Sequence, residues 1–549
     1  STLVGSQSDF TLSTGNTYPA VALPWGMNFW TPQTGKMGDG WAYTYGAHRI
    51  RGFKQTHQPS PWINDYGQFA LMPVRGNEKL DEESRASWYS HQAEVAKPYY
   101  YRVYLADHDI RAEIAPTERA AMMRFTFPES DESGVVIDAF DRGSQIGMLD
   151  ARTIVGYTTR NSGGVPDNFR NYFVVRFDTP FTAVELTDAP GEYEPGSSLL
   201  YPDGSKSVEG EHAVAKVHFS TARGQQITAR VASSFISEEQ AFQNLRELGE
   251  GGFDSVRMRA EARWNEVLGA IEVSGGTLDQ YRTFYSCLYR SVLFPRKFYE
   301  VTASGEIVHY SPYNGEVLPG YMYTDTGFWD TFRSQFPLTN ILHPTMQGRY
   351  MQALLAAQEQ CGWLPSWSAP GETGGMLGNH SISLLTDAWV KGIRTFDPAK
   401  ALEAYAHEAM NKGPWGGANG RAGWKEYWQL GYVPYPESMG STAQTLEYAY
   451  DDFCAWQLAR MTGNKFYEEI FARVMYNYRN VFDHESGFMR GRLKDGSWLS
   501  PFDPYEWGGP YCEGNAWHYN WSVFHDVQGL INLYGSDETF TQKIDSGFH

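Results

Sequence analysis

Residues 237–268 read SEEQAFQNLRELGEGGFDSVRMRAEARWNEVL and separate two parts of the chain that differ in pattern. Ser237 followed by Gln240 is the pattern of a helical capping box. Glycines 249, 251 and 252 interrupt the helix, and residues 254–268 are predicted to be helical again. Strand patterns precede this stretch and helix patterns follow it, so the 549 residues are predicted to form at least two domains.

The part before Ser237 has short β-branched and aromatic runs separated by Gly, Pro, Asp and Asn, which predict strands. Their number and spacing predict an antiparallel β-sandwich over residues 1–235, and the absence of strand–helix alternation argues against a parallel sheet. Residues 236–277 are expected to be a helical linker that ends in a last sandwich strand, 270–273. The strands predicted within the sandwich are 99–105, 122–127, 134–140, 172–177, 181–186, 213–219 and 226–232.

Residues 278–549 are predicted to be helical and to form the catalytic domain. Paired helices joined by long Trp- and Gly-rich loops indicate an α/α toroid, whose site would lie in the loops at one end. The predicted helices are 279–294, 345–361, 380–394, 398–411, 441–461, 464–481 and 516–534.

The net charge of −19 argues against nucleic acid and anionic membranes as partners. No apolar run reaches membrane-spanning length, and no signal peptide is visible. The four cysteines form no CxxC pair, which argues against a zinc ribbon or a disulfide scaffold. Aromatic residues make up 15% of the chain, a content that fits both a sugar-binding protein and a large sandwich core.

Residues 506–529, EWGGPYCEGNAWHYNWSVFHDVQG, place one acid, Glu513, among aromatic residues. Asn515 is a predicted N-cap, and Gly535 can end the helix that follows. Enclosure by rings would favour a protonated carboxyl, as a general acid requires, whereas a helix N-terminus favours the carboxylate. From this stretch alone, Glu513 is either a general acid or an ordinary capping acid.

Two further segments are candidates for ligand binding. The loop 51–69 carries His57, Trp62, Asp65 and Tyr66, and it would either line a pocket or be a well-capped loop with Trp62 as a plug. In the segment 324–338, Asp330 and Arg333 are one helical turn apart. They would bind two sugar hydroxyls or form a structural ion pair.

Two other acidic or Gly-rich segments have simpler interpretations. The segment 363–387 carries Glu372, His380 and Asp387 but no P-loop motif, and His380 is most simply a cap or core residue. Glu447, Asp451 and Asp452 crowd one helix; we favour loop capping over a catalytic or metal-binding role. The chain has no EF-hand loop, His-rich zinc pattern or GxSxG motif.

Several motifs together resemble glycoside hydrolase family 92, in the family's order and over essentially the whole chain. They are PWGM (24–27), the loop 56–69, SHQAEVAKPYYYRVYL (90–105), WDTFR (329–333), GGMLGNHS (374–381), TLEYAYDDF (445–453) and YCEGNAW (511–517). The resemblance implies a β-sandwich followed by an (α/α)6 toroid and calcium-dependent, inverting, exo-acting α-mannosidase activity.

The resemblance also assigns residues. Glu513 would be the general acid. Asp330 and Arg333 would line the pocket for the terminal mannose, and Trp62 would contact the leaving sugar, which makes an α-1,2 linkage the preferred expectation. Trp329, His380 and Asp65 are added as candidates for substrate binding. The list of substrate-binding candidates is therefore Trp62, Asp65, Trp329, Asp330, Arg333 and His380.

Two segments that the resemblance implies, one like HGNEPSHH and one like DDxGxxSAW, do not occur in the sequence. We therefore expect the toroid to be incomplete here, the calcium ligands to lie mainly beyond His549, and the general base to be unidentified. The expected partner is a mannose-containing oligosaccharide or glycoprotein glycan, and the expected location is secreted or periplasmic. The alternatives are a non-catalytic mannoside-binding fragment and an inverting phosphorylase of the same architecture.

Overall fold

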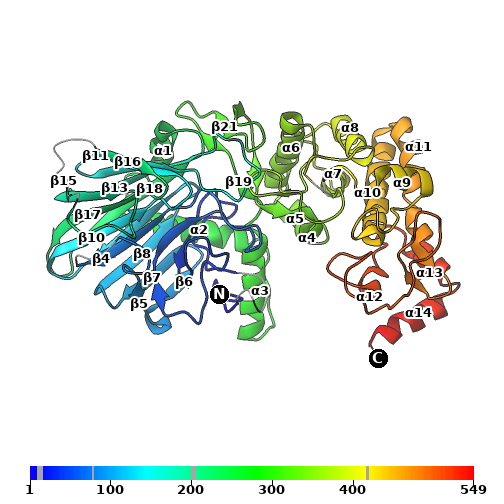
Figure 1. Cartoon of the computed structure of the whole chain (residues 1–549), viewed down its shortest axis with the longest axis horizontal. Coiled ribbons are helices and arrows are strands. Elements are labelled where there is room, and N and C mark those ends of the chain that lie inside the picture. Colours follow the sequence, from blue (N-terminus) through cyan, green and yellow to red (C-terminus); the bar gives the residue numbers. More distant parts are fainter. Residues whose placement is uncertain are drawn as a thin grey trace. The chain divides into compact units, whose positions relative to one another are not determined.

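A computed structural model describes residues 1–8, 11, 17–76, 80–197, 199–200, 206–415 and 419–548 of the chain. The chain divides into two compact units (Figure 1). The first unit contains Ser1–Thr326 and Ala369–Gly371, and the second contains Gly327–Ser368 and Glu372–His549. No helix within the described residues is long and apolar enough to cross a membrane.

The described part of the first unit contains two large antiparallel sheets, as the alternating runs predicted. All seven predicted strands form, with ends that shift by at most four residues. One sheet has the order β1 (Phe29–Gln33), β3 (Gly52–Thr56), β4 (Ala70–Arg75), β10 (Ser130–Asp138), β17 (Val214–Thr221), β14 (Ala183–Thr187) and β15 (Leu199–Leu200). The other has the order β16 (Ser207–Gly210), β11 (Ser144–Asp150), β12 (Thr153–Thr158), β13 (Asn171–Phe177), β18 (Gln226–Ser234), β9 (Ala120–Thr126), β8 (Ile110–Pro116), β7 (Tyr100–Leu105) and β6 (Val95–Lys97).

Aromatic rings join the inner faces of the two sheets. Phe69, next to β4, stacks on Phe173 of β13 with ring centroids 4.4 Å apart, and Trp30 of β1 meets Phe69 edge-on at 5.8 Å. All three side chains are fully buried. Offset and edge-on ring pairs add to the free energy gained by burying this apolar area, so part of the high aromatic content belongs to the sandwich core.

The stretch that divides the sequence packs against the nine-stranded sheet of the first unit. Helix α1 (Glu238–Leu245) is capped by Ser237, whose hydroxyl accepts from the Gln240 N–H at 3.1 Å, as predicted. Helix α2 (Phe253–Leu268) follows, and both helices bury apolar side chains with residues of strands β8, β9, β12, β13 and β18. Figure 1 shows these helices and α3 (Leu278–Ser291) beside the strands.

The strand predicted at residues 270–273 does not form, and this prediction was wrong. The N–H groups of Ala270 and Ile271 bond back to the last turn of α2, at Val267 and Leu268, so they are not available for a sheet. The remaining short elements of this unit are β2 (Arg49–Ile50), β5 (Ser87–Trp88), η1 (His91–Ala93), η2 (Arg246–Leu248), β19 (Arg296–Lys297), β20 (Glu300–Val301), β21 (Ile307–Tyr310), β22 (Val317–Pro319) and β23 (Tyr323–Thr324).

The second unit is mainly helical, which confirms the predicted order of a β-sandwich followed by a helical region. Of the predicted helices, those at α6, α7, α8 and α10 match to within four residues at each end, whereas α4, α5, α9 and α14 were not predicted. The helices are α4 (Phe328–Thr331), α5 (Gln335–Leu342), α6 (Pro344–Cys361), α7 (Ser381–Val390), α8 (Pro398–Ala409), α9 (Trp424–Leu430), α10 (Ser441–Thr462), α11 (Lys465–Val474), η3 (Asn477–Val481), α12 (Ala516–Tyr519), α13 (Val527–Leu533), α14 (Asp537–Asp545) and η4 (Ser546–Phe548).

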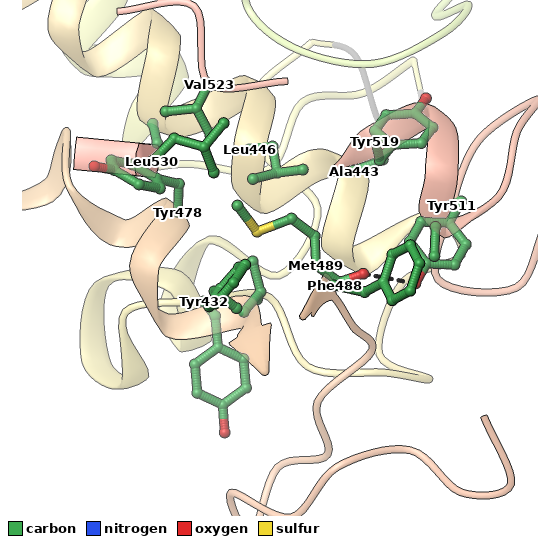
Figure 2. Packing of buried hydrophobic residues seen from close by; sticks show 14 of the residues in the cluster. Tyr432, Ala443, Leu446, Tyr478, Phe488, Met489, Tyr511, Tyr519, Val523 and Leu530 are labelled. Atoms are coloured by element: carbon green, nitrogen blue, oxygen red, sulfur yellow. Dashed lines mark hydrogen bonds between the residues drawn. The ribbon is translucent and has the colours of Figure 1, made fainter. Parts of the chain in front are cut away.

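Helix α10 is the central element of the second unit. It packs against α7, α8, α11 and η3, and its residues are buried around most of its circumference. Leu446 and Ala443 of α10 contribute to an apolar cluster with the short strands β26 (Phe482–Asp483) and β27 (Phe488–Met489) (Figure 2). Acidic side chains on a helix in such surroundings need partners, because an unpaired buried charge is costly.

The single helix predicted at 516–534 is two helices, α12 and α13. Asn520 is the C-cap of α12, and its side chain bonds with the Met489 N–H and the Tyr534 hydroxyl. Asp526 then caps α13 by accepting from the Gly529 N–H at 2.9 Å. Apolar residues at helical spacing continue across this break, which explains why periodicity alone did not reveal it.

Candidate active site

The WDTFR segment begins on the short helix α4. Phe328 is buried, and its N–H donates to the Ser366 carbonyl at 3.0 Å, which fixes the start of the helix. Trp329 and Arg333 are four residues apart and share one side of the turn. The Arg333 guanidinium lies 5.2 Å from the Trp329 ring and 4.5 Å from the Phe332 ring. These cation–π contacts favour a defined position for an otherwise flexible side chain.

Glu447 of α10 receives both of these side chains. Trp329 Nε1 donates to Glu447 Oε1 at 3.0 Å, and Arg333 Nη2 lies 3.4 Å from the same oxygen. The Glu447 side chain is 1% exposed, whereas that of Arg333 is 36% exposed. One buried carboxylate therefore contacts both the Trp329 indole and the partly exposed Arg333 guanidinium.

The buried His380 side chain contacts Glu447. Its Nε2 lies 3.2 Å from Glu447 Oε2, its Nδ1 is 2.8 Å from Asp451 Oδ1, and its ring stacks on Phe332 at 4.0 Å. Burial lowers the pKa of His380, but Asp451 and Glu447 outweigh burial and raise it to about 9. Burial also opposes ionisation of Glu447, yet His380 and Arg333 hold the pKa of that carboxyl below its usual value.

The raised pKa of His380 favours its protonated form between Glu447 and Asp451. Its side chain is 1% exposed, so in the described structure it supports the site from within the core and does not face a ligand directly. Asp451 also accepts from the Asn379 N–H at 2.6 Å, which agrees with the interpretation of this acid as a loop cap. Burial raises the pKa of Asp451.

The third acid of α10 belongs to a separate buried network. Arg421 pairs with Asp452 at 2.7 Å, and Tyr405 and Tyr427 each donate a hydroxyl to Asp452 at 2.8 Å. Sequence reasoning missed Arg421, which lies in a Gly-rich loop with no distinctive motif. The signal that was available is the acidic crowding itself, because carboxylates one turn apart in a buried helix require basic partners from elsewhere.

Glu513 lies in a turn just before α12. Its φ is +47°, in the left-handed region, and the Gly508 N–H closes the turn on the Gly514 carbonyl at 2.9 Å. Asn515 caps α12 in a capping box with His518, as the sequence predicted for that position. The Glu513 side chain is exposed.

The rings around Glu513 do not enclose it, contrary to our expectation. Tyr511 and Tyr519 are buried in the apolar cluster, with their hydroxyls bonded to the carbonyls of Met489 (2.7 Å) and Cys512 (2.6 Å), as Figure 2 shows for Tyr511 and Met489. Trp517 packs edge-on against Phe488 at 4.8 Å. Tyr511 and Tyr519 pack in the apolar cluster next to the turn, and Glu513 remains exposed to solvent.

Asp330 and Glu513 are within electrostatic range of each other. Partial desolvation by neighbouring atoms raises the pKa of Asp330, the Glu513 carboxylate raises it further, and Arg333 opposes both effects. Asp330 remains exposed to solvent. The second unit therefore presents two carboxylates, one guanidinium and one indole at its surface, a set that can bind hydroxyl groups and transfer a proton.

The loop 51–69 belongs to the first unit, and its polar side chains turn inward. Asp65 is 2% exposed and bonds to Lys54 Nζ, Thr56 Oγ1 and the His57 N–H, each at 2.8 Å. Burial opposes the charge on Asp65, but Lys54 and His57 keep its pKa below the usual value. These contacts are those of a well-capped loop.

Trp62 of the same loop faces outward. It is 56% exposed, and its ring meets Trp41 edge-on at 5.5 Å. It does not plug the loop, because more than half of the residue is exposed to solvent. Single exposed rings are common on protein surfaces, so this exposure alone does not indicate a ligand.

The Gly-rich loop of the second unit is held by Glu372. This carboxylate accepts from the N–H groups of Ser366, Trp367 and Gly374. Gly374 has φ +69°, and a Cβ there would lie 1.4 Å from the Trp415 carbonyl oxygen. The sharp turn expected of these glycines is present, and Glu372 acts as a structural acid. Asp387 pairs with Lys391 at 2.5 Å.

Over the described residues, no cluster of three or more His, Cys, Asp or Glu side chains is arranged to hold a metal ion. Asp451 and Asp452, considered as metal ligands from the sequence, are instead engaged by His380 and Arg421. Within the described residues, the side chains therefore do not form a calcium site.

Two family models cover the chain almost completely. Residues 1–234 match the glycosyl hydrolase family 92 N-terminal domain, and residues 240–549 match the glycosyl hydrolase family 92 catalytic domain. By its fold and the residues at its surface, the protein is a glycoside hydrolase. The chain belongs to glycosyl hydrolase family 92.

Solved structures agree with this membership. The family 92 inverting mannosidase BT2199 of Bacteroides thetaiotaomicron is 46% identical, with a TM-score of 0.95 over 100% of this chain and 73% of its own. The α-mannosidase BT3965 of the same species is 30% identical, with a TM-score of 0.88 over 99% of this chain and 73% of its own. An uncharacterized secreted glycosidase of Arthroderma benhamiae is 25% identical over 97% of this chain and 72% of its own length.

Proposed function

We propose that this protein is an exo-acting α-mannosidase that releases terminal mannose from oligosaccharides or glycoprotein glycans with inversion at the anomeric carbon. Three findings support this activity: membership of the family, the 46% identity to an inverting mannosidase, and the binding of mannoimidazole by BT3965. The observation that carries the proposal is the exposed Glu513 in its turn beside Asp330 and Arg333.

In the proposed reaction, Glu513 is the general acid that gives its proton to the glycosidic oxygen as the bond to the anomeric carbon breaks. A second carboxylate activates water on the opposite face, and in inverting enzymes the two carboxyl groups stand about 6.5–9.5 Å apart to leave room for that water. Asp330 and Glu513 each carry a carboxyl at the surface, and we assign Asp330 to sugar binding. The general base is left unassigned.

Asp330 and Arg333 are proposed to bind neighbouring hydroxyls of the terminal mannose, with Asp330 accepting and Arg333 donating hydrogen bonds. Trp62 of the first unit is proposed to contact a sugar of the substrate, and an α-1,2 linkage is the preferred proposal. Trp329 is proposed to line the pocket, while the buried His380 and Asp65 keep their neighbours in place. Location outside the cytoplasm is part of the proposal, supported by the name of the secreted fungal relative.

Calcium dependence follows from the resemblance and is proposed as a property of the active enzyme. Because the described side chains form no calcium site, none of the steps above is routed through the metal. Dialysis against EDTA, followed by addition of calcium or magnesium, tests this part of the proposal. Activity that survives EDTA unchanged would contradict it.

Proton NMR of mannobiose hydrolysis is the direct test of the proposed function. With α-1,2-, α-1,3- and α-1,6-mannobiose as substrates, the first product expected is β-mannose, with the α-1,2 isomer cleaved fastest. The same assay with and without phosphate distinguishes hydrolysis from phosphorolysis, the second candidate reaction. Binding of mannosides without any product would identify the chain as a binding protein only.

A further inference from the structure

Helix α4 is too short to fix its own side chains. It comprises four residues, Phe328–Thr331, and its N-cap Gly327 provides no side-chain cap. Isolated helices of such length are unstable in water, so their position depends on tertiary contacts. Asp330 leaves α4 on the exposed side, and the contacts made by its neighbours determine where its carboxyl lies.

Glu447 provides these contacts at both ends of the segment. It accepts from Trp329, the residue before Asp330, and it pairs with Arg333, the residue three positions after it. Glu447 is itself on α10, which is buried around most of its circumference, and it contacts His380, whose other ring nitrogen pairs with Asp451. The chain of contacts therefore runs from the core to the two residues that flank Asp330.

We propose that Glu447 is a positioning residue that fixes Asp330 and Arg333 in register with Glu513 by clamping Trp329 and Arg333 from the core. The kinetic part of this inference rests on the proposed function, whereas the clamp itself does not. Glu447 is 1% exposed, so we infer that it acts through the residues it contacts. A misplacement of about 1 Å in a site of this kind costs on the order of 100-fold in rate.

The test compares Glu447→Gln with Asp483→Asn. Asp483 is another buried acid of the second unit, paired with Arg490 at 3.0 Å and, within the described structure, with no hydrogen bond or ion pair to Trp329, Asp330 or Arg333, so its loss serves as the control for stability. We expect Glu447→Gln to lower kcat/KM for mannobiose about 100-fold, while Asp483→Asn lowers Tm and leaves kcat/KM within about twofold. A Glu447→Gln enzyme with kcat/KM like that of Asp483→Asn would overturn the proposal.

A double-variant cycle separates positioning from general damage. If Glu447 acts through Trp329, Trp329→Phe combined with Glu447→Gln should be no slower than the worse single variant, because Trp329→Phe has already removed the hydrogen-bond donor. Effects that multiply would contradict the inference. The same cycle measured on mannoimidazole affinity separates binding from chemistry.

A third measurement does not require activity. In protein labelled with 5-fluorotryptophan, the Trp329 signal is assigned by its loss in Trp329→Phe. Glu447→Gln is expected to shift this ¹⁹F signal, and Asp483→Asn is not. If the protein hydrolyses no mannoside but the ¹⁹F signal still shifts, the proposed function is wrong and the contact of Glu447 with Trp329 is supported. A ¹⁹F signal that does not shift would overturn the proposed role of Glu447.

Discussion

Trp329 Nε1 donates a hydrogen bond to Glu447 Oε1 at 3.0 Å, which ties the short helix α4 to the buried helix α10. The indole reaches the surface and the carboxylate does not. A surface group that is anchored in the core loses little conformational freedom when a ligand binds, and this favours binding. The predictions below concern the residues on either side of this contact.

Replacement of Glu513 tests the acid directly. Glu513→Gln keeps the size of the side chain but cannot donate the proton, so kcat for mannobiose should fall by about 10²–10⁴-fold. An aryl mannoside with a good leaving group needs less protonation and should retain far more activity. Comparison of the two substrates by initial rates checks this prediction. An equal loss on both would mean that Glu513 acts in some other way.

The contribution of His380 to stability should be visible in the pH dependence of Tm. Its folded pKa of about 9 is above the ordinary value of 6.5, so its contribution is fully present below pH 6.5 and is lost as the pH rises through 9. The wild-type Tm should therefore fall between pH 6.5 and 9. His380→Gln should be less stable at pH 6 and should lack this part of the decline. Thermal unfolding at several pH values measures it, and an identical decline in both proteins would assign it to other groups.

The buried pair Arg421–Asp452 should matter far more than a partly exposed one. Asp452→Asn leaves the Arg421 charge buried without its counter-ion, and breaking such a pair costs about 3–5 kcal/mol. The matched control is Asp387→Asn, whose partner Lys391 is solvent-accessible, and for which a loss of up to about 1 kcal/mol is expected. Urea unfolding followed by circular dichroism compares them. Equal losses would contradict the role of burial.

Alanine substitutions at two glycines can separate the cost of backbone strain from the cost of a steric collision. Gly374 and Gly463 have similar positive φ values, +69° and +74°, but only at Gly374 would a Cβ meet another atom, the Trp415 carbonyl oxygen. Gly463→Ala should therefore cost only about 1–2 kcal/mol of left-handed strain. Gly374→Ala should cost clearly more and lower Tm further. Matching Tm values for the two variants would exclude the collision.

The sequence predicted what local patterns encode. The N-caps at Ser237 and Asn515 and the alternation of the sandwich strands involve residues a few positions apart, and all three formed as expected. The second half of the capping box at Ser237 did not form, because the Gln240 side chain bonds to Asn244 and Val301 instead. The break at Asn520 was missed because its partners, Met489 and Tyr534, lie 31 and 14 residues away.

The sequence also predicted some residues of the candidate site and missed the role of another. Trp329, Asp330, Arg333 and Glu513 were named from motifs, and the structure brings Asp330 near Glu513. The role of Glu447 could not be derived, because it depends on contacts with residues 114–118 positions away and with His380 on another helix. Like charges on α10 indicated only that partners were needed.

The backbone of Glu513 has a consequence for protein engineering. With φ at +47°, this position holds an L-residue in a conformation that glycine adopts without penalty, and such strain costs on the order of 1–3 kcal/mol. A library selected only for survival at high temperature should accordingly enrich glycine at 513. Selection for heat resistance would favour glycine at position 513, whereas selection for turnover would favour glutamate. Stabilised variants of this enzyme must therefore be selected for thermal stability and activity together.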